Sequence, residues 1–220
     1  MEYLPEENSR YKDIDYWDER YKTEQCYDWL GSFSKFQHIL EKHVLKEDSI
    51  LILGCGNSSM SGDMYNAGYH GITNIDYSSV CIGTMSDRYS DCVGMTWHQM
   101  DVRRLSFPDA SFDVIIEKAT LDAIMVEEKT PWEVSPQADG FIHQALTEPH
   151  LPLPLQQQNL HHPIPEFVPG PVSIATGFHG NYVTVQCFLS RQARGALKVK
   201  VFLLSFTKIK MKPCVGFYTF

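Results

Sequence analysis

Residues 49–57 read S-I-L-I-L-G-C-G-N, and this stretch decides the fold. The apolar run Ile50 to Leu53 has the length of a strand that is buried on both faces of a parallel sheet. It stops at Gly54, Cys55 and Gly56. Glycines at the end of such a strand let the backbone turn tightly and approach a ligand, and the following helix begins with free amides. The stretch therefore predicts a strand, a ligand-binding turn and a helix.

A second apolar stretch, Gly71 to Ile75, closes with Asp76, twenty residues after Gly56. An acid at that distance is placed to hold a pair of ribose hydroxyls, although the glycines alone also fit an ordinary tight turn. Dinucleotide-binding folds usually carry a third glycine three residues after the second, but Ser59 stands there. This argues against a nicotinamide or flavin cofactor. The remaining common cofactor is a nucleoside without a pyrophosphate, S-adenosylmethionine.

Two further strands are expected, Met95 to Met100 and Phe112 to Ile116, with helices between the strands and a scaffold helix over 33–44 before them. Asp101 follows the third strand, and the charged cluster Glu117 to Asp122 follows the fourth. In a parallel sheet, the carboxyl ends of the strands face one crevice. We therefore expect these groups to lie near Gly54 and Asp76. A charge that simply ends a strand is the alternative for Asp101.

Composition places the chain among soluble globular proteins with one sizeable core, since 43% of the 220 residues are hydrophobic and 21% are charged. The first residues, M-E-Y-L-P-E-E-N, do not have the pattern of a signal peptide, and no run approaches the roughly 18 apolar residues of a membrane span. We expect a cytoplasmic protein without a membrane partner. The six cysteines occur singly. Reduced thiols are expected rather than disulfides, and no metal is expected.

The net charge of −8 argues against nucleic acid as a partner, because phosphate binding needs a basic surface. Residues 1–137 hold 24 acidic and 12 basic side chains (−12), whereas residues 138–220 hold 3 and 7 (+4). An acidic first part suits a basic protein substrate. A solvated surface is the other interpretation.

Residues 11–36 are dense in aromatic side chains. Trp17 and Tyr21 are four residues apart, so they would share one face of a helix. These rings either pack against the sheet or cover a bound purine, on which flat rings stack well.

Seven stretches between residues 10 and 135 carry a family resemblance: Y-W-D-E-R-Y (16–21), Y-D-W (27–29), L-G-C-G-N-S (53–58), N-I-D-Y-S (74–78), M-D-V (100–102), F-P-D-A-S-F-D-V (107–114) and E-K-A-T-L-D-A (117–123). On these residues the chain resembles the class I, seven-strand S-adenosylmethionine-dependent methyltransferases. Within them it is similar to the branch that methylates lysines of translation elongation factor 1-alpha. The resemblance implies an α/β, Rossmann-like sheet, S-adenosylmethionine as cofactor and elongation factor 1-alpha as protein substrate.

The resemblance also implies roles for single residues. Asp76 would hold the ribose, and Asp101 with Val102 would flank the adenine. Glu117 and Asp122 are candidates for orienting the incoming amine; alternatively, one of them pairs with Lys118 or caps the following helix. Ala119 stands where close relatives have glycine. The cofactor-binding set is Trp17, Tyr21, Trp29, Gly54, Asp76, Tyr77, Asp101, Val102 and Lys118.

The resemblance ends near residue 137, so we divide the chain into a methyltransferase core (1–137) and an atypical tail (138–220). Pro149 to Pro171 contains seven prolines and is expected to be irregular. Strands are expected at Tyr182 to Leu189 and Ala196 to Phe206. We expect the tail to leave the sheet incomplete and the fourth strand as an exposed edge, unless Lys198 to Phe206 covers it. A catalytically inactive binding module and a small-molecule methyltransferase are the alternative functions.

Overall fold

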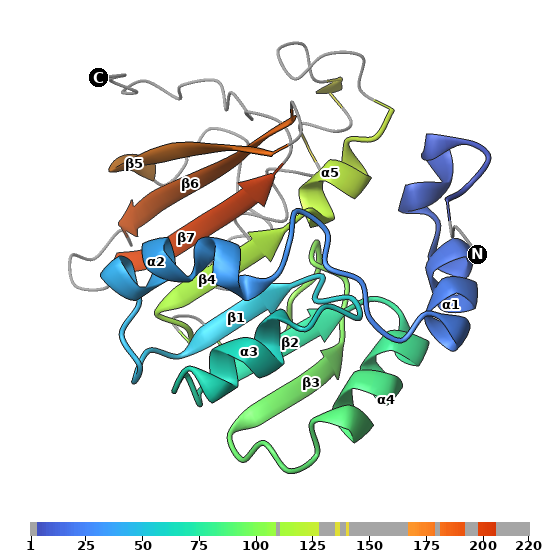
Figure 1. Ribbon diagram of the computed structural model, residues 1–220, viewed down its shortest axis with the longest axis horizontal. Helices are drawn as coiled ribbons and strands as arrows, with labels where there is room; N and C mark the ends of the chain where they lie inside the picture. The colour runs from blue at the N-terminus through green and yellow to red at the C-terminus, as the bar shows by residue number, and fades with distance from the viewer. Residues whose placement is uncertain are drawn as a thin grey trace, which may run out of the picture.

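The computed structural model describes residues 4–108, 111–127, 135–136, 140, 167–178, 181–191 and 198–205. Its centre is a seven-stranded sheet with the strand order β3-β2-β1-β4-β7-β6-β5 (Figure 1). The strands next to one another from β3 to β7 are parallel, and β6 and β5 continue the sheet in antiparallel pairs. The strands are β1 (Ile50–Leu53), β2 (Ile72–Asp76), β3 (Met95–Gln99), β4 (Val114–Lys118), β5 (Phe167–Phe178), β6 (Asn181–Arg191) and β7 (Lys198–Ser205).

One 3-10 helix and five α-helices surround the parallel strands in the described part of the chain. Figure 1 shows α2 in front of β4 and β7, α3 in front of β1 and β2, and α1 beside α4. Each described helix is too short or too polar to cross a bilayer. The helices are η1 (Asn8–Lys12), α1 (Ile14–Thr23), α2 (Phe33–His43), α3 (Met60–Asn66), α4 (Ser79–Arg88) and α5 (Thr120–Ile124).

Strand β1 separates two apolar clusters because its side chains alternate between the faces of the sheet. Ile50 and Ile52 belong to the cluster that includes buried residues of α2, α3 and α4. Leu51 and Leu53 belong to the other cluster, which includes Leu121 of α5. All four residues of β1 are buried, so the prediction of a strand covered on both faces is confirmed.

Helix α3 follows the glycine turn and begins at Met60, with Ser59 at its N-cap position. The side chains of Asn57 and Ser58 bond to the N-terminal segment: Asn57 donates to Glu24, and Ser58 donates to Asp28. The turn therefore continues to Ser59 before the helix starts at Met60.

The expected exposed edge at β4 is wrong. Strand β7 pairs with β4 in parallel, with Ile116 opposite Phe202. The continuous apolar run V-F-L-L at 201–204 is typical of an interior parallel strand rather than of an alternating surface strand. Among the described strands, the one beside β4 is β7, the last in chain order, rather than β5, the next in chain order.

The described residues of the proline-rich stretch, 167–171, belong to a strand, so the expectation of irregular structure is wrong for them. Strand β5 begins at Phe167 and includes Pro169 and Pro171, which we expected outside any regular element. It lies at the edge of the sheet, where a missing amide costs little, and its register with β6 shifts between Pro169 and Ser173. Residues 149–166 lie outside the described part of the chain.

Candidate functional site

A cavity of about 510 Å³ lies where the parallel strands end. Gly54 follows β1, Asp76 ends β2 and Lys118 ends β4. Because β1, β2 and β4 are neighbouring parallel strands, their carboxyl ends lie side by side and bring these residues together. The cavity is lined by all nine members of the predicted cofactor set, namely Trp17, Tyr21, Trp29, Gly54, Asp76, Tyr77, Asp101, Val102 and Lys118, and also by Asp122.

The turn after β1 depends on glycine. Gly54 has φ +60°, and an added Cβ would lie 2.2 Å from Oγ1 of Thr120. Thr120 needs that place because its hydroxyl donates to the carbonyl of Leu53 at 3.0 Å. Gly56 has φ +52°, and a Cβ there would lie 3.1 Å from the hydroxyl of Tyr21. A side chain at either position would therefore strain the turn or crowd the wall of the cavity.

Asp76 supports this turn as well as lining the cavity. Its Oδ2 accepts from the amide of Gly56 and its Oδ1 from the amide of Ser78, each at 3.0 Å. The side chain is 4% exposed, and burial raises its pKa to about 6. Each carboxylate oxygen can accept a second hydrogen bond, so Asp76 can hold the turn and still bind a hydroxyl pair.

Aromatic rings of the N-terminal segment form one wall. Trp17 and Tyr21 stack at 5.6 Å between ring centroids, as their spacing on α1 predicts. Trp29 meets Trp17 edge to face at 6.2 Å. Tyr11 and Tyr27 also line the cavity. Sequence reasoning placed Tyr11 and Tyr27 in the aromatic segment but did not select them for the site.

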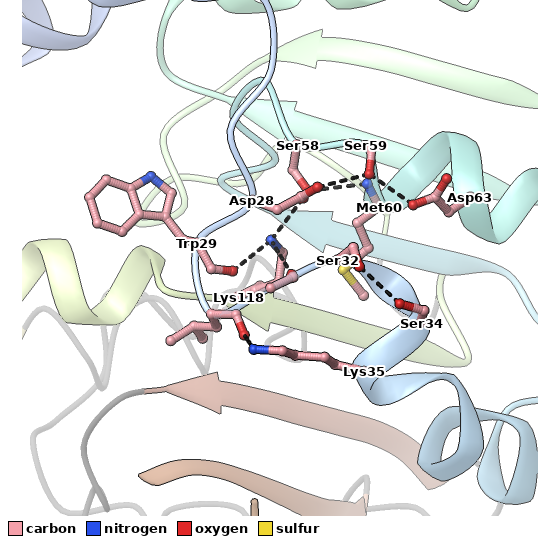
Figure 2. Close-up of polar contacts among 12 residues, drawn as sticks. Asp28, Trp29, Ser32, Ser34, Lys35, Ser58, Ser59, Met60, Asp63 and Lys118 are labelled. Atoms are coloured by element: carbon pink, nitrogen blue, oxygen red, sulfur yellow. Dashed lines mark hydrogen bonds and ion pairs between the residues drawn. The ribbon is translucent and has the colours of Figure 1, made fainter. Parts of the chain in front are cut away.

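Residues 24–31, which we call the strap, run past the end of the glycine turn, where Figure 2 shows Asp28 beside Ser58 and Ser59. Asp28 accepts from the hydroxyls of Ser58 and Ser59. Lys118 Nζ reaches the strap from the end of β4: it donates to the carbonyl of Trp29 at 2.9 Å and pairs with Asp28 at 3.4 Å. These contacts hold the ring of Trp29 at the cavity.

Burial shifts the pKa values of Lys118 and Asp28 in opposite directions. Burial lowers the pKa of Lys118, and Asp28 opposes that change. Burial raises the pKa of Asp28, but the hydrogen bonds from Ser58 and the charge of Lys118 outweigh it, so its pKa lies below the usual value. The strap is thus held by a partly buried ion pair.

Asp101 also has an internal partner. It accepts from Nε of Arg103 at 2.8 Å and from the backbone amide of Arg103 at 2.9 Å. These bonds lower the pKa of Asp101. Arg103 lines the cavity too, and it was not selected from the sequence because its spacing fits no motif.

Comparison with known proteins agrees with this geometry. The family described as "Methyltransferase domain" matches residues 50–132, which contain the glycine turn, Asp76, Asp101 and α5. Residues 50–132 therefore carry a class I S-adenosylmethionine-dependent methyltransferase domain. The cavity lies at the strand ends of this domain.

The relatives of the domain include "EEF1A lysine methyltransferase 4" of Mus musculus, which is 43% identical over 148 residues, covering 66% of this chain and 58% of the relative. The chain thus spans less than two thirds of that relative's length. It is 31% identical to the "eEF1A lysine and N-terminal methyltransferase homolog" of Drosophila pseudoobscura pseudoobscura, over 97% of this chain and 32% of that protein. Among solved structures, the [4+2]-cyclase SpnF has a TM-score of 0.44 at 16% identity, covering 66% of this chain and 57% of that one.

The residues around the cavity fit S-adenosylmethionine chemically. A purine needs flat rings, which the aromatic wall supplies, and a ribose needs a carboxylate acceptor, which Asp76 supplies. The backbone at Gly54 and Gly56 lies open to the cavity because these residues carry no side chain.

The two candidate carboxylates of the domain lie in different places. Asp122 lines the cavity, whereas Glu117 does not. Glu117 is 1% exposed, and its Oε1 accepts from the amide of Leu121 at 2.8 Å, which caps α5. Its Oε2 has no hydrogen-bond partner among the described residues. Burial, followed by the charge of Asp122, raises the pKa of Glu117 to about 8.

The four cysteines with described side chains, Cys26, Cys55, Cys81 and Cys92, are free thiols, as expected. Sulfurs of Cys55 and Cys81 and a carboxylate oxygen of Asp76 lie within 4.8 Å of one another. Burial raises the pKa of Cys55, so this thiol stays protonated at neutral pH. We assign no metal to this group.

Proposed function

We propose that the chain is a protein-lysine N-methyltransferase that uses S-adenosylmethionine and acts on translation elongation factor 1-alpha. The observation that carries the proposal is that one cavity is lined by the whole predicted cofactor set and by Asp122. The choice of substrate is supported by the names of the relatives, which are methyltransferases of this factor.

Each wall of the cavity has a proposed part in holding the cofactor. Asp76 binds the ribose hydroxyls, Tyr77 lies beside the ribose, and Asp101 with Val102 flanks the adenine. The amides and carbonyls near Gly54 bind the methionine part. Trp17, Tyr21 and Trp29 cover the cofactor, and Lys118 contacts it while holding the strap.

The cofactor, when bound, would supply a methyl group on a positive sulfonium; a neutral amine can attack this methyl carbon, with the thioether as the leaving group and without a covalent enzyme intermediate. The protein's work is to align the amine and to exclude water, and alignment alone can be worth on the order of 10⁵ M in effective concentration. Asp122 accepts a hydrogen bond from the incoming lysine and orients it. A lysine of pKa about 10.4 must lose its proton first.

Glu117 has a supporting part in this proposal. Because its pKa is about 8, it is mostly protonated at neutral pH. Its Oε1 accepts the amide of Leu121 in the first turn of α5 and so fixes the helix that carries Asp122. The acidic excess of residues 1–137 favours a basic protein surface near the cavity.

The decisive assay uses the wild-type chain, tritiated S-adenosylmethionine and recombinant elongation factor 1-alpha. We expect label on lysine, identified by mass spectrometry, and none on a factor whose labelled lysine is changed to arginine. Cofactor binding without transfer to any protein would favour the inactive binding module. Transfer only to amines in a protein-free cell extract would favour a small-molecule methyltransferase.

A further inference from the structure

Arg20 is a charged side chain at the centre of the aromatic segment, yet it is only 5% exposed. Its Nε and Nη2 donate to the two carboxylate oxygens of Glu24, each at 2.8 Å, and its Nη1 donates to the hydroxyl of Tyr16 at 3.0 Å. A buried guanidinium is costly unless it is paired and hydrogen-bonded. This forked pairing supplies that compensation and fixes the plane of the group.

Three rings pack around the same guanidinium. Its Cζ lies 5.0 Å from the ring centroid of Tyr27, 5.2 Å from that of Trp29 and 5.6 Å from that of Trp17. At these distances a cation attracts the faces of aromatic rings. All three rings line the cavity, whereas Arg20 is not among the described residues that do. The cation therefore stands behind the aromatic wall and holds it together.

Glu24 extends this arrangement to the other side of the cavity. The side-chain amide of Asn57 donates to Oε2 of Glu24 at 3.1 Å and to its backbone carbonyl at 3.0 Å. Asn57 belongs to the glycine turn and lines the cavity. A chain of contacts thus runs from the aromatic rings through Arg20 and Glu24 to the turn.

We propose that Arg20 is a positioning residue for the cofactor: it sets the aromatic wall and, through Glu24 and Asn57, aligns that wall with the glycine turn. The proposal rests on the proposed function, because it takes the cavity to be the cofactor site. Lysine should not replace Arg20. An ammonium lacks the planar fork that pairs with both oxygens of Glu24 while stacking on rings.

The test compares Arg20→Lys and Arg20→Met with Lys22→Met as a matched control. Lys22 is on the same helix but is exposed and pairs with Glu19 instead. Calorimetry with S-adenosylmethionine should give a dissociation constant raised about tenfold or more in both Arg20 variants, as expected for loss of several charged contacts. The control should match wild type. In the methyl-transfer assay, KM for the cofactor should rise while kcat at saturation stays within about twofold, because the acceptor side is untouched.

A folded Arg20→Lys protein that binds the cofactor as tightly as wild type would overturn the proposal. So would a fall in kcat equal to the rise in KM. If Arg20→Met does not fold, the test uses Arg20→Lys together with Asn57→Ala, which removes the hydrogen bonds from the glycine turn to Glu24. Absence of binding by the wild-type chain would instead remove the proposed function itself.

Discussion

At the residue scale, Asp122 is the carboxylate that the structure places at the cavity. We predict that Asp122→Asn lowers turnover by about tenfold or more but changes cofactor affinity little, because an amide accepts a weaker hydrogen bond from the incoming amine. The measurements are kcat on elongation factor 1-alpha and calorimetry with S-adenosylmethionine. Asp113→Asn is the control, since Asp113 accepts the amide of Ser49 at the other ends of the strands, where β1 and β4 begin. Equal losses in both quantities would put Asp122 among the cofactor ligands instead.

Glu117 should make stability depend on pH. Its pKa is raised from 4.5 to about 8, so the folded protein holds this proton more tightly than the unfolded chain does. The free energy of unfolding should therefore fall as the pH rises through that range. Glu117→Gln stays neutral, so its denaturation curves at successive pH values should show a shallower fall. Buried Asp76 contributes its own fall at lower pH in both proteins and cancels in the difference. Parallel curves for wild type and variant would contradict the assignment.

Several of these residue roles could not be predicted from the sequence. The residues at the strand ends could be predicted, because an apolar run that stops in G-x-G and a second run that stops in Asp76 are local patterns. The cap made by Glu117 depends on where α5 begins. The burial of Arg20 depends on three rings and Glu24 meeting in space, which no spacing rule states. Long-range packing therefore decided which acid faces the cavity.

At the element scale, α5 begins from a backbone that suits glycine better than alanine. Ala119 has φ +66° and ψ +4°, in the left-handed region. That region costs a non-glycine residue about 1–2 kcal/mol, partly offset by the greater freedom of glycine in the unfolded chain. We predict that Ala119→Gly raises the free energy of unfolding by up to about 1 kcal/mol. Ala123→Gly, inside the same helix, should lower it by about 1 kcal/mol.

Urea denaturation of both variants checks this prediction. A loss of stability in Ala119→Gly as large as that in Ala123→Gly would mean that the left-handed turn is not strained. The family resemblance implies glycine at this position, and the positive φ of Ala119 gives the physical reason for that preference.

At the scale of the whole molecule, the tail completes the sheet by pairing β7 with β4 and β6 with β7. We predict slow hydrogen exchange for the amides of Val199 to Leu204, comparable to that of Ile50 to Leu53, because both segments lie between two neighbouring strands. Edge strand β5 should exchange faster. Fast exchange throughout β7 would show that the tail does not hold this pairing in solution.

The order of the tail strands was beyond prediction from the sequence. Two of its strands could be read from their apolar runs, but the partner of a strand depends on contacts across some eighty residues between β4 and β7. Strand β5 was not predicted because it contains prolines; it tolerates them because it lies at the edge of the sheet.

Calorimetry can measure whether the cavity binds S-adenosylmethionine and whether Asp76 is its ribose ligand. The wild-type chain should bind one S-adenosylmethionine and should bind a nicotinamide dinucleotide much more weakly. Asp76→Asn should weaken the first interaction about tenfold or more, since hydrogen bonds to a charged group are worth about 1.5–3 kcal/mol. Asp48→Asn, which changes a buried acid that accepts the amide of Leu45, should bind as wild type does. Tighter binding of the dinucleotide, or unchanged affinity in a folded Asp76→Asn protein, would contradict the account.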